Sequence, residues 1–178
     1  MNHKSLSSDH HIEIKNLFQS VFTDSEGNDE GKLIAQLVEK LSKIINNEST
    51  VCYGTFFENE LIASIFFTKL FFPENILIYM LAPVAVSTSH QGKGVGQSLI
   101  KYGLQELKNR SSHIAVTYGD PAFYSKVGFE ALSEKQIQAP LKMSIPEGWL
   151  GLTLTAEPIP TIPSKPTCVE PFNDPTYW

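Results

Sequence analysis

The chain has 178 residues, of which 42% are hydrophobic and 19% are charged, and its formal net charge is −5. These values are typical of a soluble globular domain with a full hydrophobic core, and the acidic balance argues against nucleic acid as the main partner. No apolar run reaches the roughly 18 residues of a membrane-spanning helix. The polar stretch over 1–11 lacks the core of a signal peptide. We therefore expect a cytoplasmic protein that binds neither nucleic acid nor a membrane.

Hydrophobic periodicity predicts an alternation of helices and strands along most of the chain. In order, the predicted elements are helices over 10–22 and 33–45, strands over 50–57, 61–72 and 76–86, a helix over about 94–109, a strand over 113–118, a short helix over 121–126, and strands from 129 onward and over 149–155. Asp24 to Glu30 is predicted to form an acidic turn, and Glu58 to Glu60 a hairpin turn. Asp120 is expected to cap the short helix, with Pro121 at its first position.

A glycine-rich stretch, Ser89 to Ser98, follows the apolar run that ends at Val86 and leads into an amphipathic stretch. That order predicts a strand, a turn and a helix. Such a turn directs backbone N–H groups into one space, and the helix adds its unpaired first-turn donors and the positive end of its dipole. Glycine lets a ligand's oxygens approach this backbone. The stretch therefore predicts an anion site suited to phosphate.

Two familiar phosphate loops do not fit the stretch. A Walker loop requires Gly, four residues and then Gly-Lys-Ser/Thr, but Gly92-Lys93 is followed by Gly94 and the fifth position before Gly92 is Ser87. A dinucleotide fingerprint requires G-x-G-x-x-G, and its third glycine position is Gln97. The pattern that fits is Gln-x-x-Gly-x-Gly.

That pattern, Gln91, Gly94 and Gly96, is accompanied about thirty residues later by Phe-Tyr-x-x-x-Gly-Phe over 123–129. With these two signatures, over about residues 76–130, the sequence resembles the GNAT superfamily of acetyl-CoA-dependent N-acetyltransferases. The resemblance implies an α/β fold, with a central, mixed, mostly antiparallel sheet flanked by helices. It also implies that the strand ending at Val86 and the strand starting at His113 run parallel and splay apart where the cofactor enters.

The resemblance further implies that the glycine loop holds the pyrophosphate of coenzyme A, while free backbone groups of the splayed strand pair with the pantetheine arm. Acetyl-CoA is the expected co-substrate, and no metal is expected. The expected cofactor-binding residues are Val84, Ala85, Val86, Gln91, Gly92, Lys93, Gly94, Val95, Gly96 and Gln97.

Acetyl transfer from a thioester needs a polarised carbonyl, a neutral amine and a proton for the leaving thiolate. Backbone N–H groups near Ala85 and Val86 are expected to polarise the carbonyl, so Val86 is a candidate catalytic residue. The resemblance implies that Tyr124 is the general acid, and its phenol has an ordinary pKa of about 10. The run from Ile76 to Val86 contains no carboxylate. Deprotonation through ordered water and by a carboxylate from elsewhere both stay open.

The expected acceptor is a small-molecule or peptide amine, and a homodimer is compatible with the sequence. One hypothesis is that the acidic run Asp24, Glu26, Asp29 and Glu30 attracts a cationic amine; a solvated loop is the alternative. Two other function classes remain: a non-catalytic acyl-CoA sensor on the same fold, and an interaction protein that acts through its proline-rich end.

The sequence predicts a single acetyltransferase domain over 1–156 and a proline-rich tail over 157–178. Phe172, Tyr177 and Trp178 are costly to leave in water, so we expect this tail to pack on the body or on a partner subunit. Cys52 and Cys168 fit neither a disulfide framework nor a zinc spacing and are expected to be free thiols.

Overall fold

The computed structural model describes all 178 residues and contains a seven-stranded sheet with the strand order β1-β2-β3-β4-β5-β7-β6. The strands are β1 Asn2–Leu6, β2 Thr50–Phe57, β3 Glu60–Leu70, β4 Ile78–Val86, β5 Ile114–Tyr118, β6 Glu130–Ala131 and β7 Trp149–Thr153. The helices are α1 His11–Glu26, α2 Asn28–Lys43, α3 Val95–Asn109 and α4 Pro121–Tyr124. The predicted mixed α/β fold with a mostly antiparallel sheet is confirmed.

The chain forms two compact units. The first comprises Met1–Phe67 and Pro83–Tyr102, and the second comprises Thr68–Ala82 and Gly103–Trp178. Strands β3 and β4 and helix α3 each contribute residues to both units. The proline-rich tail belongs to the second unit, and the single-domain organisation over 1–156 stays a prediction.

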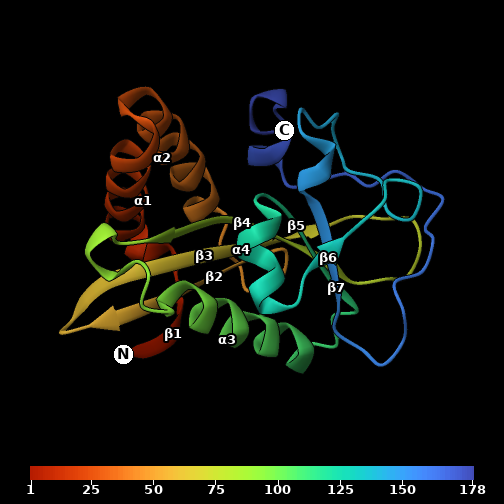
Figure 1. Cartoon of the computed structure of the whole chain (residues 1–178), viewed down its shortest axis with the longest axis horizontal. Helices are drawn as coiled ribbons and strands as arrows, with labels where there is room; N and C mark the ends of the chain where they lie inside the picture. Colours follow the sequence, from red (N-terminus) through yellow and green to blue (C-terminus); the bar gives the residue numbers. More distant parts are fainter. The chain divides into compact units, whose positions relative to one another are not determined.

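Helices α1 and α2 lie side by side in the first unit (Figure 1). The prediction of an acidic turn over 24–30 is wrong, because only Gly27, at φ 99°, separates the two helices. Asp29 and Glu30 stand in the first turn of α2, where carboxylates complement the helix dipole. The helices approach closely at Gly31, where an added Cβ would overlap the Thr23 hydroxyl.

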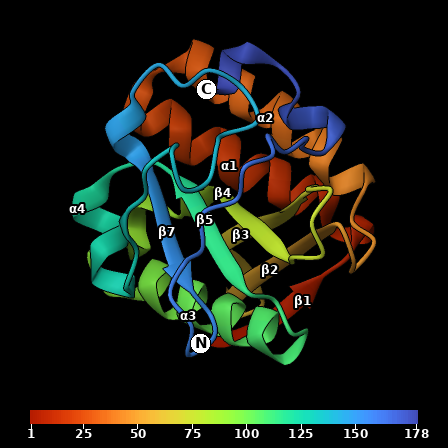
Figure 2. The ribbon, with the colours of Figure 1, turned by 90° about the vertical axis from the view of Figure 1, so that its right-hand side faces the viewer.

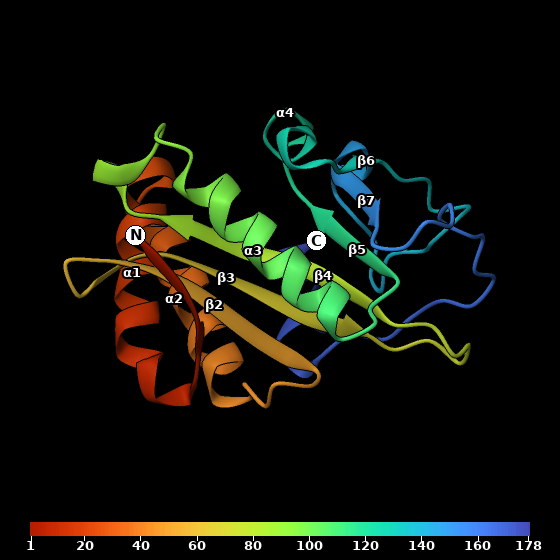
Figure 3. The same cartoon turned by 90° about the horizontal axis from the view of Figure 1, so that it is seen from below.

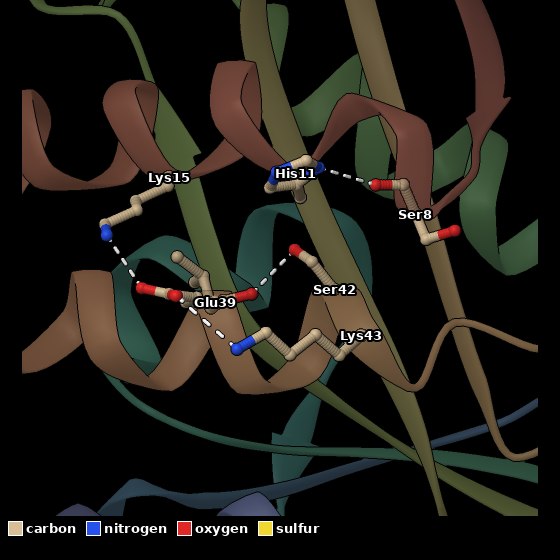
Figure 4. Close-up of polar contacts among 7 residues, drawn as sticks. Ser8, His11, Lys15, Glu39, Ser42 and Lys43 are labelled. Carbon is tan, nitrogen blue, oxygen red and sulfur yellow. Dashed lines mark hydrogen bonds and ion pairs between the residues drawn. The ribbon is translucent and has the colours of Figure 1, made fainter.

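The exposed side of the α1–α2 pair is joined by a small ion-pair network. Lys15 of α1 donates to Glu39 of α2 at 2.7 Å, and Lys43 reaches the other oxygen of that carboxylate at 3.5 Å (Figure 4). These side chains are well exposed, so the network contributes little to stability.

The first strand of the sheet was not among the predicted elements. Asn2–Leu6 pairs antiparallel with β2, with Asn2 opposite Phe56 and Leu6 opposite Cys52. Only Leu6 of this strand is buried, so the segment carries no hydrophobic pattern of its own. An edge strand can form on its partner's backbone alone.

Strands β2 and β3 are joined by the predicted hairpin turn. Glu58 and Asn59 connect the strands with φ of 50° and 68°. Positive φ at both central residues is typical of the type I′ turn, whose twist suits a hairpin.

Strand β4 pairs in parallel with β5 from Ile78 opposite Ile114 to Leu81 opposite Thr117. The predicted parallel pairing is therefore confirmed. β4 continues to Val86 after this register has ended, as expected for strands that splay.

The second unit is built on β7, which pairs antiparallel with β5, as Figure 2 shows, and with β6. Trp149 of β7 is 1% exposed, and its indole N–H donates to the Ile137 carbonyl at 2.9 Å. The tail contributes Phe172 and Trp178, which are 4% and 6% exposed. Residues 157–178 thus bury aromatic side chains in their own unit.

Both cysteines are free, as predicted. Cys52 is fully buried on β2, beside the Ser64 hydroxyl at 3.3 Å, whereas Cys168 in the tail is partly exposed. Burial raises the pKa of the Cys52 thiol to about 12. None of the helices combines the length and the apolar character needed to cross a membrane.

Candidate functional site

The glycine loop connects the end of β4 to the start of α3 in the first unit (Figure 3). A short 3₁₀ turn over Thr88–His90 follows the strand, and α3 begins at Val95. The first helical hydrogen bond runs from the Ser98 N–H to the Gly94 carbonyl at 3.0 Å. The N–H groups of the first turn, at Val95, Gly96 and Gln97, therefore have no partner within the helix.

Two glycines in this loop have left-handed backbones. Gly92 has φ of 72° and Gly94 has φ of 77°, and a Cβ added at either position would have no atom within 4 Å. The space beside both residues is therefore open, while the backbone conformation favours glycine. A side chain at either position would extend into the space that the loop leaves clear.

Hydrogen bonds from its own side chains hold the loop. The Gln91 amide donates to the Val86 carbonyl at 2.9 Å, and the Lys93 ammonium donates to the Ser89 carbonyl at 2.9 Å. Both residues are exposed. Gln91 thus fixes where the loop leaves β4, and Lys93 keeps a positive charge beside the glycines.

The end of β4 lies beyond its ladder with β5. Val84 and Val86 are partly exposed, while Ala85 is 1% exposed. Hydrogen bonding to β3 continues one residue further, where the Ser87 N–H donates to the Ile62 carbonyl at 2.7 Å. Val84 to Val86 therefore form an ordered strand end without a β5 partner.

Tyr124 ends the short helix α4 in the second unit. The Asp120 carboxylate caps this helix by accepting from the Ala122 N–H at 2.9 Å, as predicted, with Pro121 in the first turn. The Tyr124 ring lies edge-on to Phe129, with 5.8 Å between centroids. It also lies directly against Gly119, where an added Cβ would come within 2.6 Å of the ring.

The phenol of Tyr124 is a weaker acid than free tyrosine. Burial raises its pKa and the nearby Asp120 charge raises it further, while a side-chain hydrogen bond with Thr117 lowers it. Thr117 is fully buried, and its hydroxyl donates to the Leu81 carbonyl at 2.8 Å. The phenol is therefore protonated at neutral pH, as a proton donor must be.

An acidic depression of about 660 Å³ opens in the first unit, between α1, the β2–β3 turn and the start of the glycine loop. Its charged lining residues are all carboxylates, namely Glu13, Asp24, Glu58 and Glu60. Of the predicted acidic run, only Asp24 takes part. Its carboxylate accepts from the Thr88 hydroxyl at 2.7 Å, which ties the end of α1 to the segment after β4.

The histidines near the start of the chain do not gather at one point. His3 contacts Thr55 at 2.9 Å through Nδ1 and Ser98 at 2.8 Å through Nε2, whereas His11 contacts the Ser8 carbonyl (Figure 4). No group of three His, Cys, Asp or Glu side chains is placed to share a metal ion. His90 contacts Ser89 and the Phe57 ring.

Sequence patterns predicted the glycine loop and Tyr124 as site candidates, but not the residues that contact them. The Thr117 hydroxyl bonds to Leu81, 36 positions away, and the Asp24 carboxylate bonds to Thr88, 64 positions away. Such pairs have no local signal in a single sequence.

Comparisons with family profiles, curated proteins and solved structures all point to the same protein family. The profile of the acetyltransferase (GNAT) domain matches residues 2–132. The uncharacterised N-acetyltransferase YjhQ of Escherichia coli is 32% identical over 123 residues, which cover 65% of this chain and 66% of that protein. The chain therefore spans just under two thirds of this curated relative.

Solved structures share the fold at low identity. The N-acetyltransferase YhbS of Escherichia coli, in complex with CoA, has a TM-score of 0.78 and 23% identity, with 97% of this chain and 92% of that chain covered. An aminoglycoside 6'-N-acetyltransferase complexed with coenzyme A has a TM-score of 0.64 and 15% identity, with 89% and 99% covered.

Proposed function

Because the chain belongs to the GNAT acetyltransferase family, we propose that it transfers an acetyl group from acetyl-CoA to a primary amine by direct attack in a ternary complex. The observation that carries this proposal is the glycine loop at the start of α3. Its open left-handed glycines, and the first-turn N–H groups that have no partner within the helix, suit a pyrophosphate. Two similar structures contain CoA or acetyl-CoA, which supports the choice of ligand.

The residues proposed to hold acetyl-CoA fall into two groups. The backbone of Gly92 to Gln97 would face the pyrophosphate, with Lys93 adding positive charge. The strand end Val84 to Val86, which lacks a β5 partner, would pair with the pantetheine arm. When bound, acetyl-CoA supplies the thioester whose acetyl group is transferred.

Two groups of the chain are proposed to act on the reacting atoms. The backbone N–H of Val86 would donate to the carbonyl oxygen as negative charge develops there. Tyr124 would give its phenolic proton to the departing thiolate, and its raised pKa keeps that proton in place at neutral pH. The neutral amine attacks the carbonyl carbon and forms the C–N bond, and collapse of the resulting oxyanion then breaks the C–S bond. The proton that the amine nitrogen loses passes to water, and the Tyr124 phenolate takes up a proton from water to complete the cycle.

For the acceptor, we propose a cationic amine. This choice is supported by the acidic depression, whose four carboxylates have no lysine or arginine among the lining residues. The similar aminoglycoside 6'-N-acetyltransferase acts, by its name, on a nitrogen of an aminoglycoside. The tail is less suited to act as a free docking segment, since Phe172 and Trp178 are buried.

Thermal unfolding with and without acetyl-CoA tests the cofactor site. At a hundredfold excess over Kd, a ligand of the native state adds about 2.7 kcal/mol, which raises the Tm of a chain of this size by roughly 5–10 °C. Gly94→Glu should abolish the shift, because its side chain enters the open space beside the loop and adds a negative charge.

Gly27→Glu is the matched control. Gly27 also has a left-handed backbone with open space around it, but it lies between α1 and α2. Both variants should lower the Tm through backbone strain, whereas only Gly94→Glu should lose the response to acetyl-CoA. A wild-type protein without any shift at millimolar acetyl-CoA would refute the cofactor site.

A further inference from the structure

We propose that Tyr118 and Trp178 are positioning residues for Tyr124, so that the proline-rich tail sets the geometry of the catalytic phenol. This inference rests on the proposed function for the assignment of Tyr124 as the acid. All the contacts that carry it lie within the second unit.

The first step is the short connection between β5 and the acid. β5 ends at Tyr118, and Tyr124 follows six residues later at the end of α4. The Tyr124 ring lies so close to Gly119 that an added Cβ would be 2.6 Å from Cε2. The position of the Gly119 backbone therefore limits where the ring can lie.

The second step is what holds the end of β5. The Gly119 N–H donates to the Gly148 carbonyl at 2.9 Å. The Tyr118 hydroxyl accepts from the Ile145 N–H at 2.8 Å and contacts the Ser144 hydroxyl at 3.1 Å. Backbone and side chain thus anchor this turn to the segment before β7.

The third step is the packing of the tail against Tyr118. The Trp178 indole stacks on the Tyr118 ring, with 6.0 Å between centroids and 16° between planes. It also contacts Trp149 at 6.3 Å, and its N–H donates to the Phe172 carbonyl at 2.9 Å. Trp178 is 6% exposed, so its own position is well defined by packing.

Together these contacts form a chain from Trp178 through Tyr118 and Gly119 to the phenol. A shift of about 1 Å in a reacting group can lower a rate by roughly a hundredfold. Loosening Trp178 is therefore expected to reduce the rate of proton delivery without removing the acid itself.

The experiment compares Trp178→Ala, Trp178→Phe and Tyr118→Phe with Ile162→Ala. Ile162 is a buried tail residue, 5% exposed, whose N–H bonds to Gln136, so its variant reports general loss of tail packing. Acetyl transfer is measured by thiol release with acetyl-CoA and spermidine as the probe amine, below the Tm of every variant.

Trp178→Ala should lower kcat roughly tenfold or more with KM for acetyl-CoA within about twofold of the wild type. Trp178→Phe should restore most of kcat because the ring stacking is kept. Tyr118→Phe keeps the stacking but loses the anchoring hydroxyl, so kcat should fall between these values. Ile162→Ala should leave kcat near the wild-type value.

A second readout does not need activity. The Tyr124 phenol is titrated by NMR in protein labelled at tyrosine Cζ, with Tyr124→Phe used to assign its signal. Trp178→Ala should shift this titration, since burial is the main cause of the raised pKa and a displaced ring is buried to a different extent, and Ile162→Ala should not.

Equal effects of Trp178→Ala and Ile162→Ala on kcat and on the titration would overturn the positioning role. Should Trp178→Ala fail to fold, a Tyr118→Phe variant with unchanged kcat and unchanged titration would overturn it equally. A wild-type protein that binds no acetyl-CoA would refute the proposed function instead, while the titration would still test the contact chain.

Discussion

The Tyr124 phenol depends on Thr117, a single buried side chain on β5. Thr117 Oγ1 has one proton, which it donates to the Leu81 carbonyl at 2.8 Å. When the Tyr124 phenol is neutral, the Thr117 oxygen can accept the phenolic hydrogen bond. When the phenol has lost its proton, the Thr117 hydroxyl can rotate and donate to the phenolate. This second arrangement explains why Thr117 lowers the pKa of Tyr124.

Thr117→Val removes this hydroxyl without changing the side-chain shape, so the Tyr124 pKa should rise. A general acid is active below its pKa, so the alkaline limb of the kcat profile should move to higher pH. At neutral pH kcat should fall, but less than in Tyr124→Phe, for which loss of a general acid predicts roughly 10²- to 10⁴-fold.

Thr68→Val is the matched control for this substitution. Thr68 is also fully buried in the second unit, and its hydroxyl has no hydrogen-bond partner. An alkaline limb that moves equally in both variants, or in neither, would contradict the role assigned to Thr117.

At the scale of elements, helix α1 contributes both to the α1–α2 pair and to the acidic depression. Its side chains Ile14 and Phe18 are fully buried. The same helix places Glu13 and Asp24 on the depression. The carboxylates of Glu13 and Asp24 thus line the depression, whereas those of Asp29 and Glu30 lie outside it, in the first turn of α2.

Neutralising Glu13, Asp24, Glu58 and Glu60 together, as Gln or Asn, should raise KM for a cationic amine such as spermidine by roughly tenfold, because the attracting field is removed. KM for acetyl-CoA should stay nearly constant. Steady-state kinetics at low salt give both values.

The control neutralises Glu26, Asp29 and Glu30, which lie outside the depression. It removes three of the charges in the predicted acidic run, so it also tests the original interpretation of that run. If the control raised KM for spermidine as much as the fourfold variant, the depression would have no special part in binding the acceptor.

Elements with their own hydrophobic pattern were predictable from the sequence, and elements defined by a partner were not. Strand β2 was predicted with the bounds that the structure has. Strand β1 was missed because only Leu6 among its five residues is buried. The acidic run was misread as a turn because Asp and Asn favour turns and helix N-termini alike, and Gly27 stands among them.

The candidate site divides in the same way. The glycine loop and Tyr124 could be predicted as candidates because each belongs to a short motif whose residues are neighbours in the sequence. Trp178 and Tyr118 lie 60 positions apart, and only the packing of the second unit makes them neighbours. No periodicity in a single sequence reports a contact of this kind.

At the scale of the whole molecule, His3 couples the stability of the first unit to pH. It connects β1 to Thr55 of β2 and to Ser98 in the first turns of α3. Burial lowers the His3 pKa from its ordinary value of 6.5, and the positive chain terminus lowers it further. The folded state therefore binds this proton less tightly than the unfolded state.

The His3 contribution to stability is thus present above pH 6.5 and is lost as the pH falls through the lower folded pKa. The Tm difference between the wild type and His3→Gln should shrink between pH 7.5 and 5.5, with His11→Gln as a control. A difference that grows towards acid pH would contradict this sign.

The two native thiols differ in accessibility, so their reaction with a labelling reagent can report local opening of the structure. Maleimides react with thiolates, and a Cys52 pKa of about 12 together with full burial makes this residue inert in the native state. Cys168 is the partly exposed thiol, so an unmodified chain accepts a fluorophore at one position, inside the tail that covers Tyr118. The rate at which Cys52 reacts then measures how often the β2 region opens, without any engineered cysteine.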